Sequence, residues 1–313
     1  MRLLILTHDR DAASYRVRWG AFEPAWRGAG VAAETREIPK RGRGRFLDAA
    51  RGFDVVVLQR RLLRARDFRR LRAAARRLVY DVDDALLFRP SPPHRSRLRA
   101  LRFFRAVAGA DAVFAGNRVL AGYARLRSAR VFVVPSAVEV ERAPPRDTPP
   151  GFRVVWTGQR ATRPHLELIR ETILGAGFSL VAVADAAPAG AAFVPWTPAA
   201  EADALASAHV GIMPLPDDPF ARGKCGYKLL RYHAAGLAAV ASPVGANRSI
   251  ASGSGALLAR TPDDWVRALA RLRDDPALRA RLARQGRAFV ERRYAAPLLL
   301  PRLAALLTHV ASL

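Results

Sequence analysis

Short apolar runs alternate along the whole chain with stretches whose hydrophobic residues recur at helical spacing. Apolar runs bounded by polar or glycine-rich turns are typical of strands buried inside a parallel sheet. The pattern predicts such strands in both halves of the sequence. They cover residues 2–7, 31–37, 54–59, 78–80, 111–115 and 131–134, and then 152–156, 178–183, 192–196, 210–215, 237–241 and 253–258.

Helical spacing separates most of these runs. Trp19, Phe22 and Trp26, for example, are spaced as one face of a helix. Strands that alternate with helices predict an α/β protein with parallel sheets. The other expected helices cover residues 61–77, 95–108, 118–126, 164–175, 199–208, 227–235, a segment that begins at 262, 276–293 and 294–313.

A proline-rich polar segment, residues 139–151, interrupts this rhythm and is typical of a linker between domains. The length of 313 residues also favours about two domains. We therefore expect two Rossmann-like domains, residues 1–140 and 150–295. The first lacks a GxGxxG sequence, so it carries no dinucleotide fingerprint.

Residues 210–245 form the most informative stretch: strand, polar loop, helix, strand. The loop turns basic at Arg222, Gly223 and Lys224, just before the expected helix. Free backbone N–H groups and the helix dipole favour an anion at such a helix start. Lys224 and Lys228 are four residues apart, so they are expected to share a helix face and to contact phosphate. The alternative is an ordinary solvated basic face.

The composition limits the kinds of molecule that this protein is expected to bind. The 52 Lys and Arg residues outnumber the 27 Asp and Glu residues, which gives a net charge of +25 and predicts attraction to polyanions. Only three of the cations are lysines, and two of these are Lys224 and Lys228. Because the arginines are spread along the chain and no zinc-finger or RNA-binding motif is present, we expect no nucleic-acid partner.

Cysteine content and hydropathy bear on location. Cys225 is the only cysteine, which excludes an intramolecular disulfide and a cysteine-based metal cluster. No signal peptide and no apolar run of about 18 residues is found. These features predict a cytoplasmic protein. The cationic helix at 61–77 is interpreted either as a solvated face or as a patch that holds the protein peripherally on anionic lipid, at the inner face of the membrane.

Charged residues follow two strands of the first half. Arg16 and Arg18 come after the first strand, at the edge where open α/β sheets bind ligands, so they are candidates to contact an anionic substrate. Asp81, Asp83 and Asp84 follow the fourth strand and are candidates for acid–base chemistry or a metal. The alternatives are surface arginines and a turn whose carboxylates cap N–H groups.

Four stretches in this order resemble the retaining GT-B glycosyltransferases of family four, the glycosyl transferases group 1. These are VVVLQR with LVYDVDDALL, FAGNRVLAGYA, VVWTGQRATRPHLELI, and the sequence from Gly211 to Gly245. The resemblance implies two Rossmann-like domains facing across a cleft. It further implies that the last helix, 296–313, returns to the N-terminal domain, which binds the acceptor, while the C-terminal domain binds a nucleotide-sugar donor.

The resemblance also implies a metal-independent transfer with retention and without a protein nucleophile. Cationic side chains and helix N–H groups stabilise the departing diphosphate. Arg160 and Lys224 match the two catalytic cations of the family, and Asp83 is expected to orient the acceptor hydroxyl. The remaining donor-side candidates are Gly158, Arg163, Gly223, Cys225, Gly226, Lys228, Arg231 and Gly245; the acceptor-side ones are Arg16, Arg18, Asp81 and Asp84. No cofactor or metal is expected, and the acceptor is a saccharide or a lipid-linked molecule.

Two departures from the family define an alternative. Glutamates usually stand where this chain has Gly223 and Arg231, and the His-Asp of the N-terminal domain is replaced by the Asp81–Asp84 segment. The alternative is a non-catalytic GT-B module that binds a nucleotide sugar or a glycan. A weaker alternative is a protein that binds polyanions by charge alone.

Overall fold

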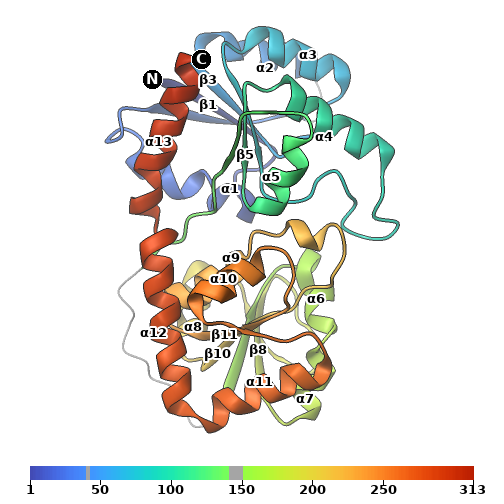
Figure 1. The fold of residues 1–313 in the computed structure, drawn as a ribbon, viewed down its shortest axis with the longest axis vertical. Coiled ribbons are helices and arrows are strands. Elements are labelled where there is room, and N and C mark those ends of the chain that lie inside the picture. The colour runs from blue at the N-terminus through green and yellow to red at the C-terminus, as the bar shows by residue number, and fades with distance from the viewer. Residues whose placement is uncertain (40–42, 141–150) are drawn as a thin grey trace. The chain divides into compact units, whose positions relative to one another are not determined.

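The computed structural model describes residues 1–39, 43–140 and 151–313 (Figure 1). Most of the predicted linker, from 141 to 150, therefore lies outside the described residues. The chain divides into two compact units. Unit 1 comprises Met1–Ala137, Asp218–Cys225 and Ala296–Leu313, and unit 2 comprises Val138–Asp217 and Gly226–Ala295.

Unit 1 contains a parallel six-stranded sheet in the order β2-β1-β3-β4-β5-β6. All five residues of β3 and all five of β4 are buried, as expected of strands covered on both faces. The strands are β1 (Arg2–Thr7), β2 (Ala32–Glu37), β3 (Val55–Gln59), β4 (Leu78–Val82), β5 (Ala112–Ala115) and β6 (Val131–Val133).

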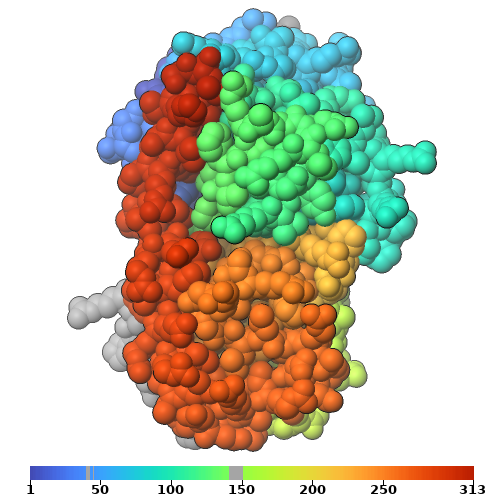
Figure 2. All heavy atoms as spheres, in the orientation of Figure 1, coloured from blue at the N-terminus to red at the C-terminus, as the bar shows by residue number. Residues whose placement is uncertain are grey.

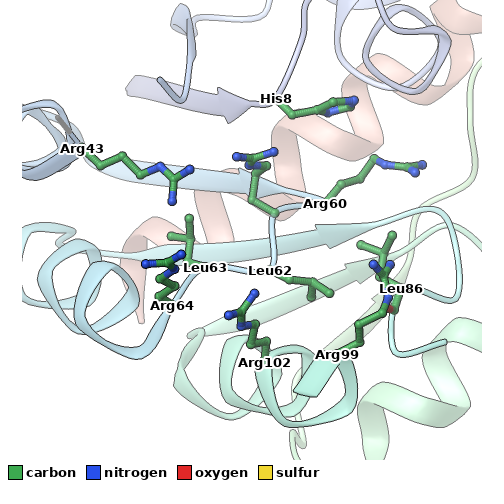
Figure 3. A pocket seen from close by; sticks show the side chains of 10 residues that line it. His8, Arg43, Arg60, Leu62, Leu63, Arg64, Leu86, Arg99 and Arg102 are labelled. Carbon is green, nitrogen blue, oxygen red and sulfur yellow. The ribbon is translucent and has the colours of Figure 1, made fainter. Parts of the chain in front are cut away.

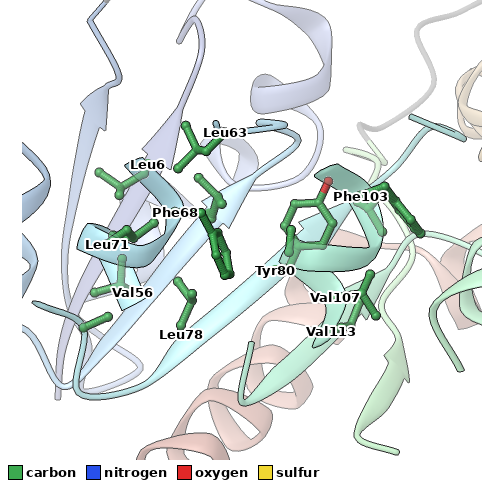
Figure 4. Close-up of a cluster of buried hydrophobic side chains, with 14 of the residues drawn as sticks. Leu6, Val56, Leu63, Phe68, Leu71, Leu78, Tyr80, Phe103, Val107 and Val113 are labelled. Carbon is green, nitrogen blue, oxygen red and sulfur yellow. The ribbon is translucent and has the colours of Figure 1, made fainter. Parts of the chain in front are cut away.

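Two apolar layers cover the faces of this sheet. One contains Leu6, Val56 and Tyr80 from the strands, with Phe68 and Phe103 from helices (Figure 4). It is completed by α2 (Arg43–Asp48), η2 (Ala49–Gly52), α3 (Ala65–Ala74), α4 (Arg97–Gly109) and α5 (Arg118–Arg125). The other layer is formed by α1 (Ala13–Arg16), η1 (Gly20–Ala25) and the last helix, α13 (Ala296–Ser312), whose outer side is visible as dark red spheres in Figure 2.

Unit 2 contains a second parallel six-stranded sheet, in the order β12-β11-β10-β7-β8-β9. Its strands are β7 (Arg153–Thr157), β8 (Ser179–Ala184), β9 (Ala192–Pro195), β10 (Val210–Met213), β11 (Ala238–Ala241) and β12 (Leu257–Leu258). Its helices are η3 (Arg160–Thr162), α6 (Arg163–Glu167), α7 (Arg170–Gly175), α8 (Pro198–Ala206), α9 (Tyr227–Ala234), α10 (Ala246–Ser254), α11 (Pro262–Asp274) and α12 (Pro276–Arg293). The prediction of two Rossmann-like sheets is confirmed.

Four local predictions are corrected. The helix expected at 61–77 is limited to α3, because residues 61–64 continue the loop after β3. The helix expected at 164–175 is two short helices, α6 and α7. Helix α10 was not predicted, because its sequence ANRSIASGS is rich in small residues. Lys224 precedes α9, so it does not share a face of that helix with Lys228.

Each sheet has one topological switch point, where successive connections leave a strand pair in opposite directions. In unit 1 this point lies between β1 and β3, and in unit 2 between β7 and β10. Open α/β sheets bind ligands beyond the carboxyl ends of the strands at such points. The loops after these four strands are therefore the first places to look for function.

Candidate functional site

The carboxylates after β4 are neutralised by cations within unit 1. The Arg60 guanidinium donates to Asp83 Oδ1 at 2.5 Å and to Asp84 Oδ2 at 2.9 Å. Lys224 Nζ lies 3.0 Å from Asp84 Oδ1. Both carboxylates are largely buried, with exposed fractions of 8% and 7%. The structure thus brings together Asp83, Asp84 and Lys224, and adds Arg60, which was not predicted.

The environments of the two carboxylates differ. Burial raises the pKa of Asp83, and the nearby Asp84 charge adds to this effect although Arg60 opposes it. Burial would also raise the pKa of Asp84, but the charges of Lys224 and Arg60 hold it below its usual range. Adjacent carboxyls whose pKa values are pushed apart are suited to different roles in one reaction. Asp83 is the one suited to accept a proton.

The backbone of Arg60 is unusual. It has a φ of 59°, and it is the one non-glycine residue with positive φ in the described ranges. This conformation costs roughly 1–2 kcal/mol in an L-residue. Hydrogen bonds from Arg60 N to Asp81 O, and from Arg61 N to Gln59 O, hold the turn in place. Strain of this kind concentrates at functional sites. Its position directly after a switch-point strand was the available sequence signal.

Arg18 and Asp81 form a buried ion pair with two-point contact. Trp19 Nε1 also donates to Asp81, and Arg18 donates to Val134 O. The two residues are 4% and 0% exposed, so neither presents its charge to an acceptor in this structure. The expectation of ligand contact is corrected for this pair: its geometry fits a structural role. Arg16 donates to Asp11 O and is half-buried.

The segment Asp218–Cys225 belongs to unit 1, although it was expected in the C-terminal domain. Asn117 donates from Nδ2 to Gly223 O at 2.8 Å, and Cys225 Sγ donates to Asp83 O at 3.1 Å. A Cβ at position 223 would lie 2.5 Å from Ala85 Cβ and 2.6 Å from Ala85 N. Only glycine fits there, which explains why this chain has no glutamate at position 223.

In unit 2, the predicted cations Arg160 and Arg163 are exposed at the starts of η3 and α6, which follow β7. Lys228 lies in α9, with Nζ 5.7 Å from the centre of the Trp156 ring. The predicted role of Gly158 was close approach to a donor. In the structure a Cβ at Gly158 would lie 2.1 Å from the Trp156 indole, so the indole itself requires the glycine.

The other predicted donor residues lie at helix starts or on α9. Gly226, with φ 73°, and Gly245, with φ 54°, immediately precede α9 and α10. Both helices therefore begin beyond the strand ends of unit 2, and the positive end of a helix dipole favours an anion. Arg231, which stands where the family has its second glutamate, is ion-paired with Glu201 at 3.7 Å.

Tyr232 was not singled out from the sequence. Its buried hydroxyl donates to Ile212 O and accepts from Thr157 N, at 3.0 and 3.1 Å. It thereby ties the carboxyl ends of β10 and β7 at the switch point of unit 2. A Cβ at Gly211 would lie 2.3 Å from the ring, so the glycine in β10 makes room for it. The glycine inside a buried strand was the available sequence signal.

The described residues contain neither a cluster of metal ligands nor a membrane-spanning helix. No group of three or more His, Cys, Asp or Glu side chains is arranged to hold a metal ion. No helix in these residues is both long enough and apolar enough to cross a bilayer.

Residues 160–275 match the family of glycosyl transferases group 1. This segment contains Arg160, Arg163, the residues 223–231 and Gly245. No curated protein sequence matches.

Solved structures share the whole fold. Anabaena HepE in complex with UDP and glucose is 14% identical, covers 99% of this chain and 100% of its own, and has a TM-score of 0.73. HepE in complex with UDP-glucose gives 13%, full coverage of both chains and the same TM-score. Sucrose-phosphate synthase from Thermosynechococcus elongatus is 15% identical over 99% of both chains, with a TM-score of 0.76. These similarities confirm the GT-B fold.

Proposed function

We propose, from the match of residues 160–275 to the glycosyl transferases group 1, that this chain is a glycosyltransferase. It transfers a sugar from a nucleotide-diphosphate-sugar donor to a saccharide or lipid-linked acceptor, with retention and without a metal ion. The observation that carries the proposal is that the matched segment contains the loop after β10 and begins at η3, directly after the loop that follows β7, at the switch point of unit 2.

The proposed chemistry needs positive charge where the diphosphate departs. A bond forms between the acceptor oxygen and the anomeric carbon, the bond from that carbon to the diphosphate breaks, and the acceptor proton passes to the departing phosphate. Arg160 and Arg163 provide exposed cations in unit 2, and α9 and α10 provide N–H groups. Lys224 is the proposed second catalytic cation, which leaves Asp84 for the phosphate when the donor binds.

In unit 1, Asp83 is the proposed acceptor contact. Its raised pKa makes it a better hydrogen-bond acceptor for a hydroxyl than an ordinary surface aspartate. Arg60 holds one carboxylate oxygen and so fixes the orientation of the group. Asp84, which pairs with Lys224 and Arg60, is proposed to keep these cations in position.

The proposed donor is tested first by thermal shift with a panel of nucleotide diphosphate sugars, because a ligand that binds the native state raises its melting temperature. UDP-glucose begins the panel, since HepE binds it. Release of the nucleotide diphosphate is then measured with the donor that binds. Arg160→Ala and Lys224→Ala are expected to lower turnover by about a hundredfold or more. The matched control is Arg267→Ala, an exposed arginine on α11. Unchanged turnover in both variants contradicts the proposal.

The second candidate is a non-catalytic module, and it rests on Gly223 and Arg231. Neither position carries the acid of the family, and Arg231 is engaged with Glu201. Donor binding without transfer or hydrolysis across a broad acceptor panel favours this candidate. Binding that disappears with moderate salt and ignores the sugar favours a protein that binds polyanions by charge alone.

We further propose a cytoplasmic location at an anionic membrane surface. Helix α4 exposes Leu98 and Leu101, at 54% and 57%, beside Arg97. An apolar pair next to cations suits the boundary between headgroups and acyl chains. Sedimentation with phosphatidylglycerol vesicles, compared with phosphatidylcholine vesicles, tests this. Leu98→Ser with Leu101→Ser is expected to weaken the binding.

A further inference from the structure

A cationic pocket of about 480 Å³ lies in unit 1 (Figure 3). Six of its ten lining residues are arginines, one is a histidine, three are leucines, and none is acidic. The lining residues are His8, Arg43, Arg60, Arg61, Leu62, Leu63, Arg64, Leu86, Arg99 and Arg102. The volume is within the range of small-molecule sites, roughly 300–1,000 Å³.

The pocket lies at the switch point of the unit 1 sheet. His8 follows β1, and Arg60 to Arg64 follow β3, which are the two strands that flank this point. Arg99 and Arg102 reach it from α4. The sequence analysis placed the ligand-facing cations of this edge at Arg16 and Arg18. The structure puts Arg18 in a buried ion pair and gathers other arginines around the open space instead.

Three of the pocket arginines already have partners. Arg43 donates to Asp67 at 3.2 Å, Arg60 to Asp83 and Asp84, and Arg99 to the backbone carbonyls of Leu86 and Phe88. The side chains of the other three, Arg61, Arg64 and Arg102, make no hydrogen bond or ion pair with any residue that the structure describes. Their guanidinium groups are therefore available to a ligand.

The uncompensated charge alters neighbouring groups. Burial lowers the pKa of His8, and the charges of Arg60 and Arg61 lower it further although Asp9 and Glu37 oppose them. Burial and the charge of Arg43 lower the pKa of Arg61. The Nδ1 atom of His8 is buried without a hydrogen-bond partner. An anion in the pocket relieves each of these costs.

We propose that this pocket binds a phosphate or diphosphate group carried by the sugar acceptor. Guanidinium forks match the geometry of phosphate oxygens, and Leu62, Leu63 and Leu86 provide an apolar wall for the part of the molecule next to the anion. Arg60 belongs both to the pocket and to the Asp83–Asp84 pair, so an anion bound here is held next to the proposed acceptor contact. The acceptor role rests on the proposed glycosyltransferase function, whereas anion binding does not.

The test uses the full chain and inorganic pyrophosphate as the probe. Binding is measured by calorimetry, and occupancy of the pocket by the NMR titration of the His8 imidazole, identified by its loss in His8→Gln. Pyrophosphate is expected to raise the pKa of His8. The triple variant Arg61→Gln, Arg64→Gln, Arg102→Gln is expected to weaken binding at least tenfold. The matched control removes three exposed arginines of α3 and α4 that do not line the pocket: Arg66→Gln, Arg69→Gln, Arg97→Gln.

Two results would overturn the proposal that this pocket binds an anion. One is an equal loss of pyrophosphate binding in both triple variants, and the other is a His8 pKa that pyrophosphate leaves unchanged. Competition with pyrophosphate distinguishes the sources of the anion. A soluble hexose 1-phosphate or a lipid-linked diphosphate in detergent micelles is expected to displace it, and displacement by one of them identifies the source. Displacement by neither overturns the acceptor role. These binding experiments contain no nucleotide-sugar donor. Their outcomes therefore do not depend on whether the chain transfers a sugar, and failure of the proposed function can be told apart from failure of the pocket proposal.

Discussion

Lys224 Nζ lies 3.0 Å from one oxygen of Asp84, whose other oxygen accepts from Arg60 at 2.9 Å. The lysine expected to bind the diphosphate is thus held, in this structure, by a carboxylate of unit 1. In the proposed mechanism the carboxylate holds the ammonium in place until the donor phosphate displaces Asp84 from it.

Loss of this pair is expected to be measurable. Lys224→Met removes one of the two cations on a buried carboxylate and is expected to lower the free energy of unfolding by about 2 kcal/mol. It is also expected to raise the pKa of Asp84. Between its lowered folded-state pKa and the ordinary aspartate pKa, Asp84 is protonated only in the unfolded state, so its contribution to stability is lost as pH falls. Because Lys224→Met brings the folded-state pKa back toward the ordinary value, urea unfolding from pH 6 to pH 3 is expected to show a smaller fall in this variant than in the wild type.

Gly223 offers a sharper test of the loop that carries Lys224. A methyl group there meets Ala85 at 2.5 Å, so Gly223→Ala is expected to cost about 1–3 kcal/mol through overpacking. Gly122→Ala is the matched control. It lies within α5 with nothing within 4 Å of its would-be Cβ, and it is expected to stabilise by about 0.5–1 kcal/mol. Equal effects in chemical denaturation contradict the tight fit at Ala85.

Strand patterns and the order of the elements were predictable from the sequence, because buried parallel strands produce apolar runs that need no knowledge of the partner strand. Helix α10 was not, because ANRSIASGS has small residues where a helical stripe is usually large. The start of α3 was also predicted wrongly. It was placed at residue 61 instead of Ala65, because residues 61–64 have the same arginine- and leucine-rich composition as the helix that follows.

Asp83 and Asp84 were selected from the sequence because they follow a buried strand, and the structure brings them together with Lys224 and Arg60, while their roles stay predictions. Partners remote in sequence were not found. The ion pair of Arg18 with Asp81 and the close packing of Gly223 against Ala85 produce no periodic pattern in the sequence. Each depends on which loops the fold brings together. Arg60 was missed because an arginine is unremarkable in a chain so rich in arginine, and its positive φ is a property of the backbone alone.

The Arg18–Asp81 pair is expected to stabilise unit 1 rather than to bind a ligand. Arg18→Met leaves a buried carboxylate with Trp19 as its one remaining side-chain partner among the described residues, at an expected cost of about 3–5 kcal/mol. Arg267→Met, which breaks an exposed pair with Asp264, is expected to cost less than about 1 kcal/mol. The double variant Arg18→Met, Asp81→Leu is expected to recover part of the loss. Lost acceptor binding with unchanged stability in Arg18→Met contradicts this assignment.

A single substitution of Asp83 is expected to change both the stability and the activity of the protein. Asp83→Asn keeps the shape of the side chain but removes its charge, and it is expected to lower transfer by about a hundredfold to ten-thousandfold because, in the proposed mechanism, the carboxylate orients the acceptor hydroxyl. Burial raises the pKa of Asp83, so the unfolded chain loses this proton at lower pH than the folded one. In the interval above the usual aspartate pKa the folded state therefore binds more protons, and stability falls as pH rises. Asp83→Asn is expected to flatten this part of the stability profile.

Ionisation of Asp83 is expected to affect the reaction rate and the stability in opposite directions as pH rises. The ionised form is the active one, so kcat/KM in the wild type is expected to rise with pH through the raised pKa of Asp83. This limb is expected to be absent in Asp83→Asn, whose remaining rate is independent of that proton. The control is Asp274→Asn, an exposed aspartate on α11 that pairs only with Arg273 among the described residues. A variant that keeps both the acid limb and the wild-type rate removes Asp83 from the mechanism, whatever its effect on stability.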